Sequence, residues 1–185
     1  ARVLRVMAIA VTALAVAPSL GRTGDAAAAL PPGNTVAQWN RIAEDTVVGS
    51  GAFQSEGLIY MAYVSAAVYD ALVAIEGGFE SYGPAITAPA GASSDAAVVE
   101  AAYRTLVHYF PSQAGTLGAL YTEALGLIAD GSAKSDGRAV GLAAATHIIT
   151  LRSGDGRMTP IRLRTGRSDH KPLGLLTRLR GGSTV

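Results

Sequence analysis

Residues 55–76 constrain the fold most strongly, because this stretch is long and almost free of charge. Between Glu56 and Glu76 the only charged residue is Asp70. Its larger apolar residues recur at spacings of three and four, which is typical of a helix. These residues are Met61, Val64, Val68, Leu72 and Ile75. Apolar residues also cover most of the other sides of this helix. A helix that is apolar nearly all round is buried on most sides, because its side chains avoid water. The stretch therefore predicts a central helix, whose Ala and Ser residues let neighbouring helices approach closely.

Four more helices are expected in the same part of the chain, since apolar residues recur there at helical spacing. They span residues 34 to about 48, 95–110, 112 to about 128, and about 132–152. Asn34, Ser94 and Ser112 are the expected N-terminal caps, because their side-chain oxygens can accept from free backbone amides. Residues 84–94 are rich in Pro, Ala and Gly and predict a connecting loop. The fold class is thus all-α, a bundle of about five helices with short links.

Three sets of polar residues on these helices could carry chemistry, and the first two are a row of charged residues and a single histidine. Glu100, Arg104 and His108 follow one another at intervals of four, with the order from Glu to Arg that helices favour, which predicts a solvated ridge. His147 lies on an apolar face of the last helix and could be a metal ligand or a base. A core histidine with satisfied hydrogen bonds is the preferred interpretation, because one imidazole without partners does no catalysis.

Asp70 is the third candidate, since a carboxylate on an apolar helix needs donors such as a tyrosine hydroxyl, a helix cap or an Arg. A structural buried hydrogen bond is preferred over catalysis, because no second carboxylate stands at helical spacing. The common nucleotide-binding, zinc-protease and hydrolase motifs do not occur. Ser168 and Lys171 match the short serine–lysine pattern of penicillin-recognising enzymes, but the partner motifs are missing and chance explains the match better. No catalytic, cofactor-binding or metal-binding residue is therefore assigned.

The net charge of +1 conceals three segments of different charge. Residues 1–29 carry three Arg and one Asp, and residues 157–185 carry seven Lys or Arg and one Asp. Between them, residues 30–156 carry five Lys or Arg and twelve Asp or Glu. Such an acidic body argues against nucleic acid as the partner. The chain has no cysteine, which excludes disulfides, thiolate metal sites and cysteine nucleophiles.

Residues 1–29 predict an export signal peptide. Arg2 and Arg5 form a charged start, residues 6–17 are apolar, and the small residues 26–29 offer a cleavage site. The mature protein would then begin near Leu30 and be secreted. The apolar run is shorter than the roughly 20 residues that cross a bilayer, so no stable membrane span is expected and a membrane anchor is the alternative.

Several stretches of the body carry a family resemblance. They are residues 36–40, 67–76 with 79–82, 101–106 before Phe110 and Pro111, 117–128, and 151–156. On these residues the chain resembles the N-terminal helical part of bacterial vanadium-dependent haloperoxidase-like proteins, which belong with the type-2 phosphatidic-acid phosphatase superfamily. The resemblance covers residues 34 to about 156, or about two thirds of the chain. It implies the helical architecture of the N-terminal half of that fold, with residues 30–156 as one domain.

The same resemblance implies that the chemistry of the family lies elsewhere. The family holds vanadate or phosphate with a Lys-to-Arg-Pro motif, a Pro-Ser-Gly-His motif and a Ser-Arg-to-His motif, all in its C-terminal half. Here Pro111-Ser112 continues as Gln113-Ala114, and Lys171 precedes Pro172 without the matching context. Vanadate is therefore the cofactor of the family, and none is expected to bind this chain.

After Gly156 the chain changes to a basic segment without helical or strand period. One hypothesis is that residues 157–185 are read in a shifted frame that ends at an early stop. It is motivated by their Arg and Gly content, which GC-rich DNA tends to give out of frame. A basic tail for an acidic surface is the alternative. A Pro-Ser-Gly-His element in another frame downstream would distinguish the two.

Two functions remain open. The first is a secreted vanadium-dependent haloperoxidase-like protein, whose family performs halide oxidation by peroxide or related phosphatase chemistry, with this chain inactive. The second is a non-catalytic helical interaction domain. In both, the apolar helix of residues 55–76 has few neighbours to cover it, so self-association through an exposed apolar face is expected.

Overall fold

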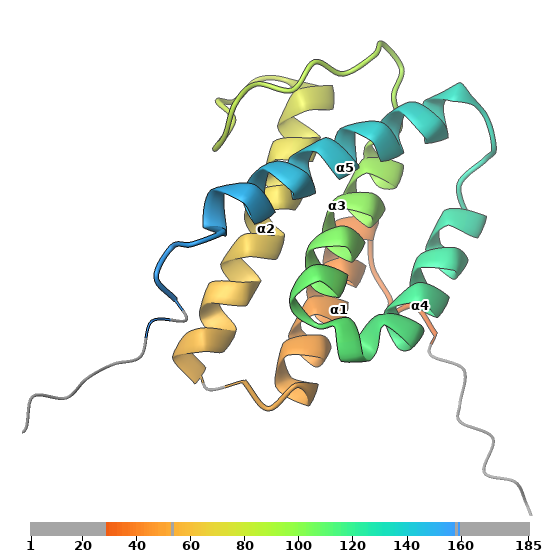
Figure 1. Ribbon diagram of the computed structural model, residues 1–185. Coiled ribbons are helices and arrows are strands. Elements are labelled where there is room, and N and C mark those ends of the chain that lie inside the picture. Colours follow the sequence, from red (N-terminus) through yellow and green to blue (C-terminus); the bar gives the residue numbers. More distant parts are fainter. Residues whose placement is uncertain (1–28, 53, 158, 160–185) are drawn as a thin grey trace, which may run out of the picture. The chain divides into compact units, whose positions relative to one another are not determined.

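The computed structural model describes residues 29–52, 54–157 and 159 of the 185-residue chain. Its helices are α1 (Thr35–Gly49), α2 (Gln54–Glu76), α3 (Ser94–Tyr109), the short 3-10 helix η1 (Pro111–Gln113), α4 (Ala114–Gly126) and α5 (Ser132–Arg152) (Figure 1). No strand occurs in the described ranges, so the all-α prediction is confirmed. The five α-helices belong to one compact unit that ends at Arg152. The export signal up to residue 28, and the basic tail from residue 160 with Ser168 and Lys171, lie outside the described residues.

Of the three N-terminal caps predicted from the sequence, one is observed and two are not. Asn34 caps α1 as predicted, with its Oδ1 accepting from the backbone N of Ala37 at 2.9 Å. The cap of α3 is Ser93 and not Ser94, whose hydroxyl instead donates to Glu76 at 2.5 Å. Ser112 caps nothing, because the chain forms the tight turn η1 before α4 begins, and α4 has no side-chain cap. Two polar residues in sequence can both satisfy a cap pattern, so the pattern alone does not fix which one is used.

The centre of the bundle is α3. It packs against α1, α2, α4 and α5, which surround it (Figure 1). Nine of its sixteen residues are buried. They are Ala96, Ala97, Val98, Val99, Glu100, Ala101, Ala102, Thr105 and Leu106. These side chains are mostly small, which allows neighbouring helices to reach α3 from several directions.

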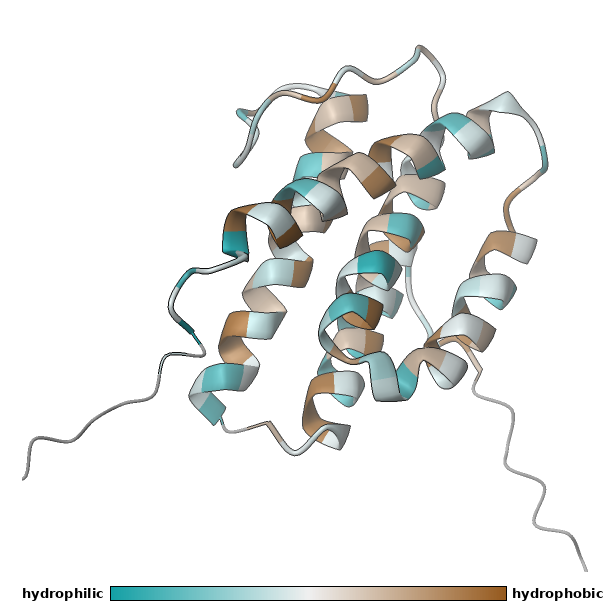
Figure 2. Cartoon of the chain, viewed as in Figure 1, coloured by the Kyte–Doolittle hydropathy of each residue, from teal (hydrophilic) through white to brown (hydrophobic). Residues whose placement is uncertain are grey.

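The prediction that residues 55–76 form the central helix is wrong. The helix itself exists as α2, and it packs against α1, α3 and α5. Its other side is open, since Leu58 is 73% exposed and Ile59 and Tyr69 are also exposed. Hydrophobic residues recur along α2 in Figure 2. A bundle of this size has enough helices to surround one of them, and the smaller side chains of α3 make it the one that is surrounded.

The closest helix pairing joins α3 to α5. Gly137 and Gly141 of α5 face the backbone of α3, and a Cβ on either glycine would overlap a carbonyl oxygen, of Ser93 or of Ala97. The backbone N of Ser93 also donates to the carbonyl of Ala133 at 2.8 Å. The two backbones thus meet without intervening side chains, as happens where small residues line both helices. We call this pairing the α3–α5 seam.

By length and composition, α2 is the one helix in the described part of the chain that could cross a membrane. One third of its most apolar window is buried inside the bundle. Core helices of soluble proteins pass the same test of length and composition, so the finding identifies α2 as unusually apolar and no more.

Candidate functional site at two buried carboxylates

Two carboxylates are buried in the bundle, and they are the places where chemistry would be expected. Glu100 on α3 and Asp70 on α2 are each 1% exposed. A buried carboxylate is costly unless hydrogen bonds or opposite charges compensate it. The structure compensates the two in different ways.

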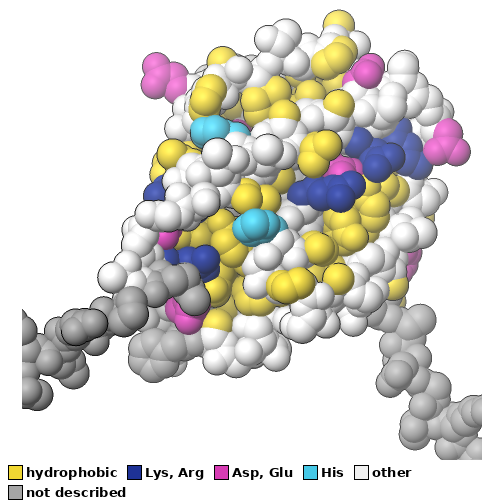
Figure 3. Space-filling view, in the orientation of Figure 1, with side chains coloured by type: hydrophobic (Ala, Val, Ile, Leu, Met, Phe, Trp, Pro, Cys, Tyr) yellow, Lys and Arg dark blue, Asp and Glu magenta, His cyan; other side chains and the backbone are white. Residues whose placement is uncertain are grey.

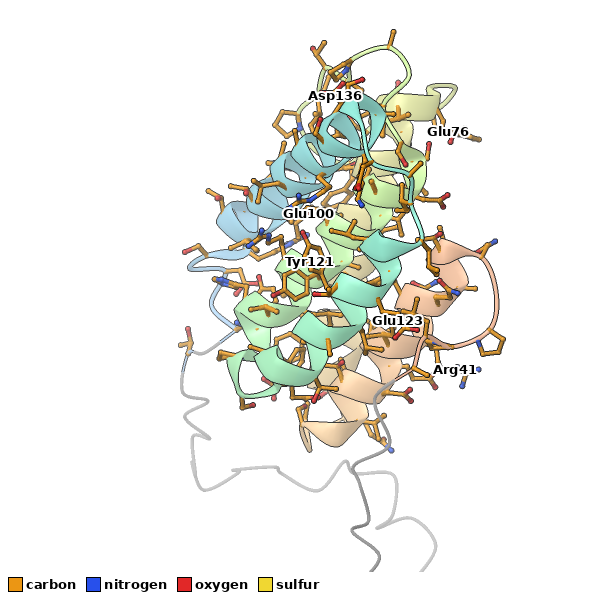
Figure 4. All side chains as sticks on the ribbon, turned by 90° about the vertical axis from the view of Figure 1, so that its right-hand side faces the viewer. Arg41, Glu76, Glu100, Tyr121, Glu123 and Asp136 are labelled. Carbon is orange, nitrogen blue, oxygen red and sulfur yellow. The ribbon has the colours of Figure 1, made fainter. Side chains whose placement is uncertain are left out.

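Glu100 is held by three donors from three helices. Arg104 donates from Nε to Oε1 at 2.6 Å, and Arg138 of α5 donates from Nε to Oε2 at 2.9 Å. The hydroxyl of Tyr121 on α4 donates to Oε2 at 2.5 Å. Figure 4 shows Glu100 and Tyr121 close together on neighbouring helices. The carboxylate therefore connects α3, α4 and α5.

The prediction of a solvated ridge is therefore wrong for Glu100, which is buried, and correct for His108 at the other end of the ridge. The ion pair between Glu100 and Arg104 exists with the predicted spacing, and His108 is exposed. Tyr121 and Arg138 could not be found from helical spacing, because they come from other helices, 21 and 38 residues away. The available signal was the sequence around Glu100, where a charge stands among Ala and Val residues on both sides.

Two stacked tyrosines pack against the arginines. The rings of Tyr103 and Tyr121 stack with their centroids 4.1 Å apart. The guanidinium of Arg104 lies 5.5 Å from the ring centroid of Tyr103, and that of Arg138 lies 5.9 Å from the ring centroid of Tyr121. Cation–π contacts and ion pairs thus act on the same two arginines, which limits their rotamers.

The electrostatics of the cluster keep Glu100 ionised. Burial alone raises the pKa of the Glu100 carboxyl, but the hydrogen bonds from Tyr121, Arg138 and Arg104 together outweigh it and lower the pKa below its usual value. Burial and the hydrogen bond to Glu100 both raise the pKa of the Tyr121 hydroxyl. At neutral pH the cluster therefore holds one negative and two positive charges, with a neutral tyrosine.

Asp70 fastens the loop between α2 and α3. Its Oδ1 accepts from the backbone N of Tyr82 at 2.6 Å, and its Oδ2 accepts from the backbone N of Gly83 at 3.1 Å. The neighbouring Tyr69 hydroxyl donates to the carbonyl of Glu80 at 2.8 Å. The prediction of a structural buried hydrogen bond is confirmed, although the donors are backbone amides of the loop.

His147 of α5 lies beside Asp70 without being satisfied by it. Its Nδ1 is 3.9 Å from Oδ2 of Asp70, too far for a hydrogen bond, and this buried nitrogen has no hydrogen-bond partner in the described part of the chain. The prediction of a satisfied core histidine is therefore wrong. The cause is the loop, whose backbone at Gly83 packs directly against the imidazole ring, leaving no room for a Cβ. Arg152 secures the same loop by donating to the Tyr82 hydroxyl.

A third feature is apolar and lies between α1 and α2. Val48 and Leu58 are 74% and 73% exposed on these two neighbouring helices. They border a groove of about 550 Å³ that Val47 and Met61 also line, together with Glu44. We call this area the α1–α2 surface. Exposed apolar side chains that border one groove make this surface a candidate for association.

Neither carboxylate belongs to a group suited to metal binding. Within the described ranges, no three His, Cys, Asp or Glu residues are arranged so that they could hold a metal ion. Comparisons with protein-family models, with curated proteins and with solved structures found no match. The assignment of a function therefore depends on the geometry of these three features.

Proposed function

We propose that this chain is a non-catalytic helical interaction domain that associates with a second copy of itself through the α1–α2 surface. One observation carries the proposal: Val48 and Leu58 stand about three-quarters exposed on adjacent helices, around one groove. Burying two such side chains against their counterparts in a two-fold arrangement would remove four large apolar groups from water.

Charge favours a second copy as the occupant of this surface. The helical body of residues 30–156 is acidic, with five Lys or Arg against twelve Asp or Glu, while residues 157–185 carry seven Lys or Arg against one Asp. Together with the three Arg and one Asp of residues 1–29, this gives the whole chain a net charge of only +1. Proteins near zero net charge associate readily, since copies do not repel one another and opposite charges on two copies attract.

The state of the buried carboxylates supports a role without catalysis. Both oxygens of Glu100 accept hydrogen bonds, and so do both oxygens of Asp70. A general acid or base has to reach a substrate, and these groups are engaged within the bundle. The proposal retains the resemblance to the N-terminal helical part of vanadium-dependent haloperoxidase-like proteins, as a scaffold without the oxyanion-binding motifs of that family.

Light scattering combined with size-exclusion chromatography tests the association over a wide range of protein concentration. The 185-residue chain should shift from monomer to dimer as concentration rises. The variant Val48→Ser with Leu58→Ser should weaken the dimer about tenfold or more, because it removes the apolar contacts at the centre of the surface.

The matched control is Leu127→Ser with Leu142→Ser. Leu127 is 76% exposed at the end of α4, and Leu142 is 45% exposed on α5, so the control removes exposed leucines away from the surface. It should leave the dimer unchanged. A wild-type chain that stays monomeric at all concentrations contradicts the proposal, as does an equal effect of the two double variants. A monomer that binds a hydrophobic dye at this surface would indicate a different partner.

Activity is tested separately with vanadate, peroxide and bromide, and with an aryl phosphate. We expect neither bromination of a phenol dye nor phosphate release above background, because the oxyanion-binding donors of the family are absent from the sequence. Turnover within about tenfold of a full-length haloperoxidase would overturn the non-catalytic part of the proposal.

A further inference from the structure

Basic residues are scarce in the helical body, yet three of them gather in one place. Of the five Lys and Arg residues between positions 30 and 156, Arg104, Lys134 and Arg138 lie around the contact of α3, α4 and α5. Figure 3 shows dark blue side chains next to one another on this side of the molecule, with magenta carboxylates beside them. Glu100 and Asp130 pair with these cations, so an anion would be attracted by the donors that the pairs leave unused and not by a large excess of positive charge.

A hollow of about 490 Å³ lies beside this patch. It is formed by the end of α4, the turn that follows and the first turns of α5, and Lys134 and Arg138 both line it. These two residues are four positions apart on α5, a spacing that places side chains on the same face of a helix. Asp130 also lines it, with Tyr121 and Ser135, whose hydroxyls donate to Glu100 and to the carbonyl of Ser132.

Arg138 has donors left for a ligand. Its Nε donates to Oε2 of Glu100 at 2.9 Å, and its guanidinium also interacts with the Tyr121 hydroxyl, so a ligand would use the remaining Nη donors. The Arg138 side chain is 42% exposed, so part of it can be reached from solvent. The outer edge of a guanidinium presents two parallel N–H groups, the geometry that binds a carboxylate in a bidentate manner.

Lys134 also has capacity for an anion. Its Nζ donates to the carbonyl of Ile128 at 3.1 Å and to Oδ1 of Asp130 at 2.8 Å, while an ammonium group has three donors. The lysine side chain is only 16% exposed, whereas that of Asp130 is 97% exposed. Because Asp130 itself is solvated, a carboxylate from solution can compete with it for Lys134.

We propose that this hollow binds a small dicarboxylate, with one carboxylate on the outer edge of Arg138 and the other on Lys134. The second carboxylate takes the place of Asp130. Lys134 and Arg138 lie four residues apart on the same face of α5, so a diacid with a short carbon chain such as succinate is the probe. The site lies on α4 and α5, away from the α1–α2 surface, and does not depend on the proposed association.

Asp130→Asn is the most informative variant, because Asp130 is exposed and contributes little to folding. It removes the competing carboxylate from Lys134 and should raise the affinity for succinate about two- to fivefold, the equivalent of a surface ion pair. Lys134→Gln should instead reduce binding of succinate to the level of acetate, since one carboxylate contact is lost.

Side-chain NMR signals of arginine Nε–H groups give a readout on the wild-type chain that needs no variant. Titration with succinate should move the Arg138 signal and saturate, while acetate moves it at higher concentration and Arg41 stays unchanged with both. Arg41 is the control because it forms an ordinary exposed pair with Glu44. Equal shifts at Arg41 and Arg138 would show only an effect of ionic strength and overturn the site.

The remaining outcomes also decide the matter. If Asp130→Asn leaves the succinate affinity unchanged, Lys134 does not take part and the proposal is wrong. If a glutamate-rich peptide binds much more tightly than succinate and moves the same Arg138 signal, the carboxylates come from a protein partner, which overturns a small-molecule ligand.

Discussion

The α3–α5 seam and the α1–α2 surface show opposite uses of apolar residues. At the seam, Gly137 and Gly141 bring two backbones together, and the facing residues Ala96 and Ala97 are fully buried. At the surface, the much larger Leu58 remains mostly exposed. The amount of apolar area on a helix therefore does not determine its place in this bundle. Small residues decide it, because they determine how closely neighbouring helices can approach.

The strongest test of the seam is to add methyl groups to it. Gly137→Ala together with Gly141→Ala should destabilise the protein by about 3–6 kcal/mol, since each Cβ meets a backbone oxygen that cannot rotate away. The same substitution in an open helical position, Gly115→Ala in α4, should stabilise it by up to about 1 kcal/mol. Urea denaturation measures both. If the double variant had the same stability as wild type, α3 and α5 could move apart freely. The α3–α5 seam would then be no more tightly packed than the α1–α2 surface.

The second prediction concerns the ion pair that joins Arg138 of α5 to Glu100 of α3. Arg138→Gln should cost about 2–3 kcal/mol, because it leaves the buried Glu100 with one cation fewer. Glu100→Gln should cost less, since Arg104 and Arg138 are about half-exposed and can turn to water. Denaturation of the two variants gives the order directly. The reverse order would mean that packing of Arg138 on Tyr121, and not charge, is the main contribution.

The same cluster predicts a dependence of stability on acid. The pKa of Glu100 is lowered in the folded protein from its usual 4.5, so the unfolded chain binds the proton more readily. Its stabilising effect is therefore complete above the unfolded pKa and is lost as the pH falls through the folded pKa. The stability difference between wild type and Glu100→Gln should be constant from neutral pH to about pH 5 and shrink below it. A difference that grows on acidification would contradict the assigned ionisation.

The sequence predicted the helices well and their arrangement poorly. Helical periodicity is local, so α5 and the cap at Asn34 could be recognised from a few residues. The arrangement depends on contacts between helices, which periodicity does not contain. Glu100 shows the difference, because its pairing with Arg104 is local and was predicted, while Arg138 comes from another helix. His147 was misjudged for the same reason, as the loop that packs on it is joined to α2 and not to α5.

A smaller effect is expected at the loop that Asp70 holds. Asp70→Ala should cost about 1–3 kcal/mol, because it leaves the backbone amides of Tyr82 and Gly83 without their acceptor. Hydrogen exchange of these two amides should become faster while that of the α3–α5 seam changes little. The exposed Asp45→Ala serves as the control and should change neither. Unchanged exchange at Tyr82 in Asp70→Ala would show that the loop is held by other contacts.

The central claim is that the α1–α2 surface is open in one copy and is covered by a second. Because the chain has no cysteine, a single thiol can be introduced at either of two equally exposed leucines, as Leu58→Cys or Leu127→Cys. Treatment with a short thiol-reactive cross-linker should give a covalent dimer in good yield with Leu58→Cys and little with Leu127→Cys. Equal yields from the two variants, or no dimer from Leu58→Cys, would contradict the account.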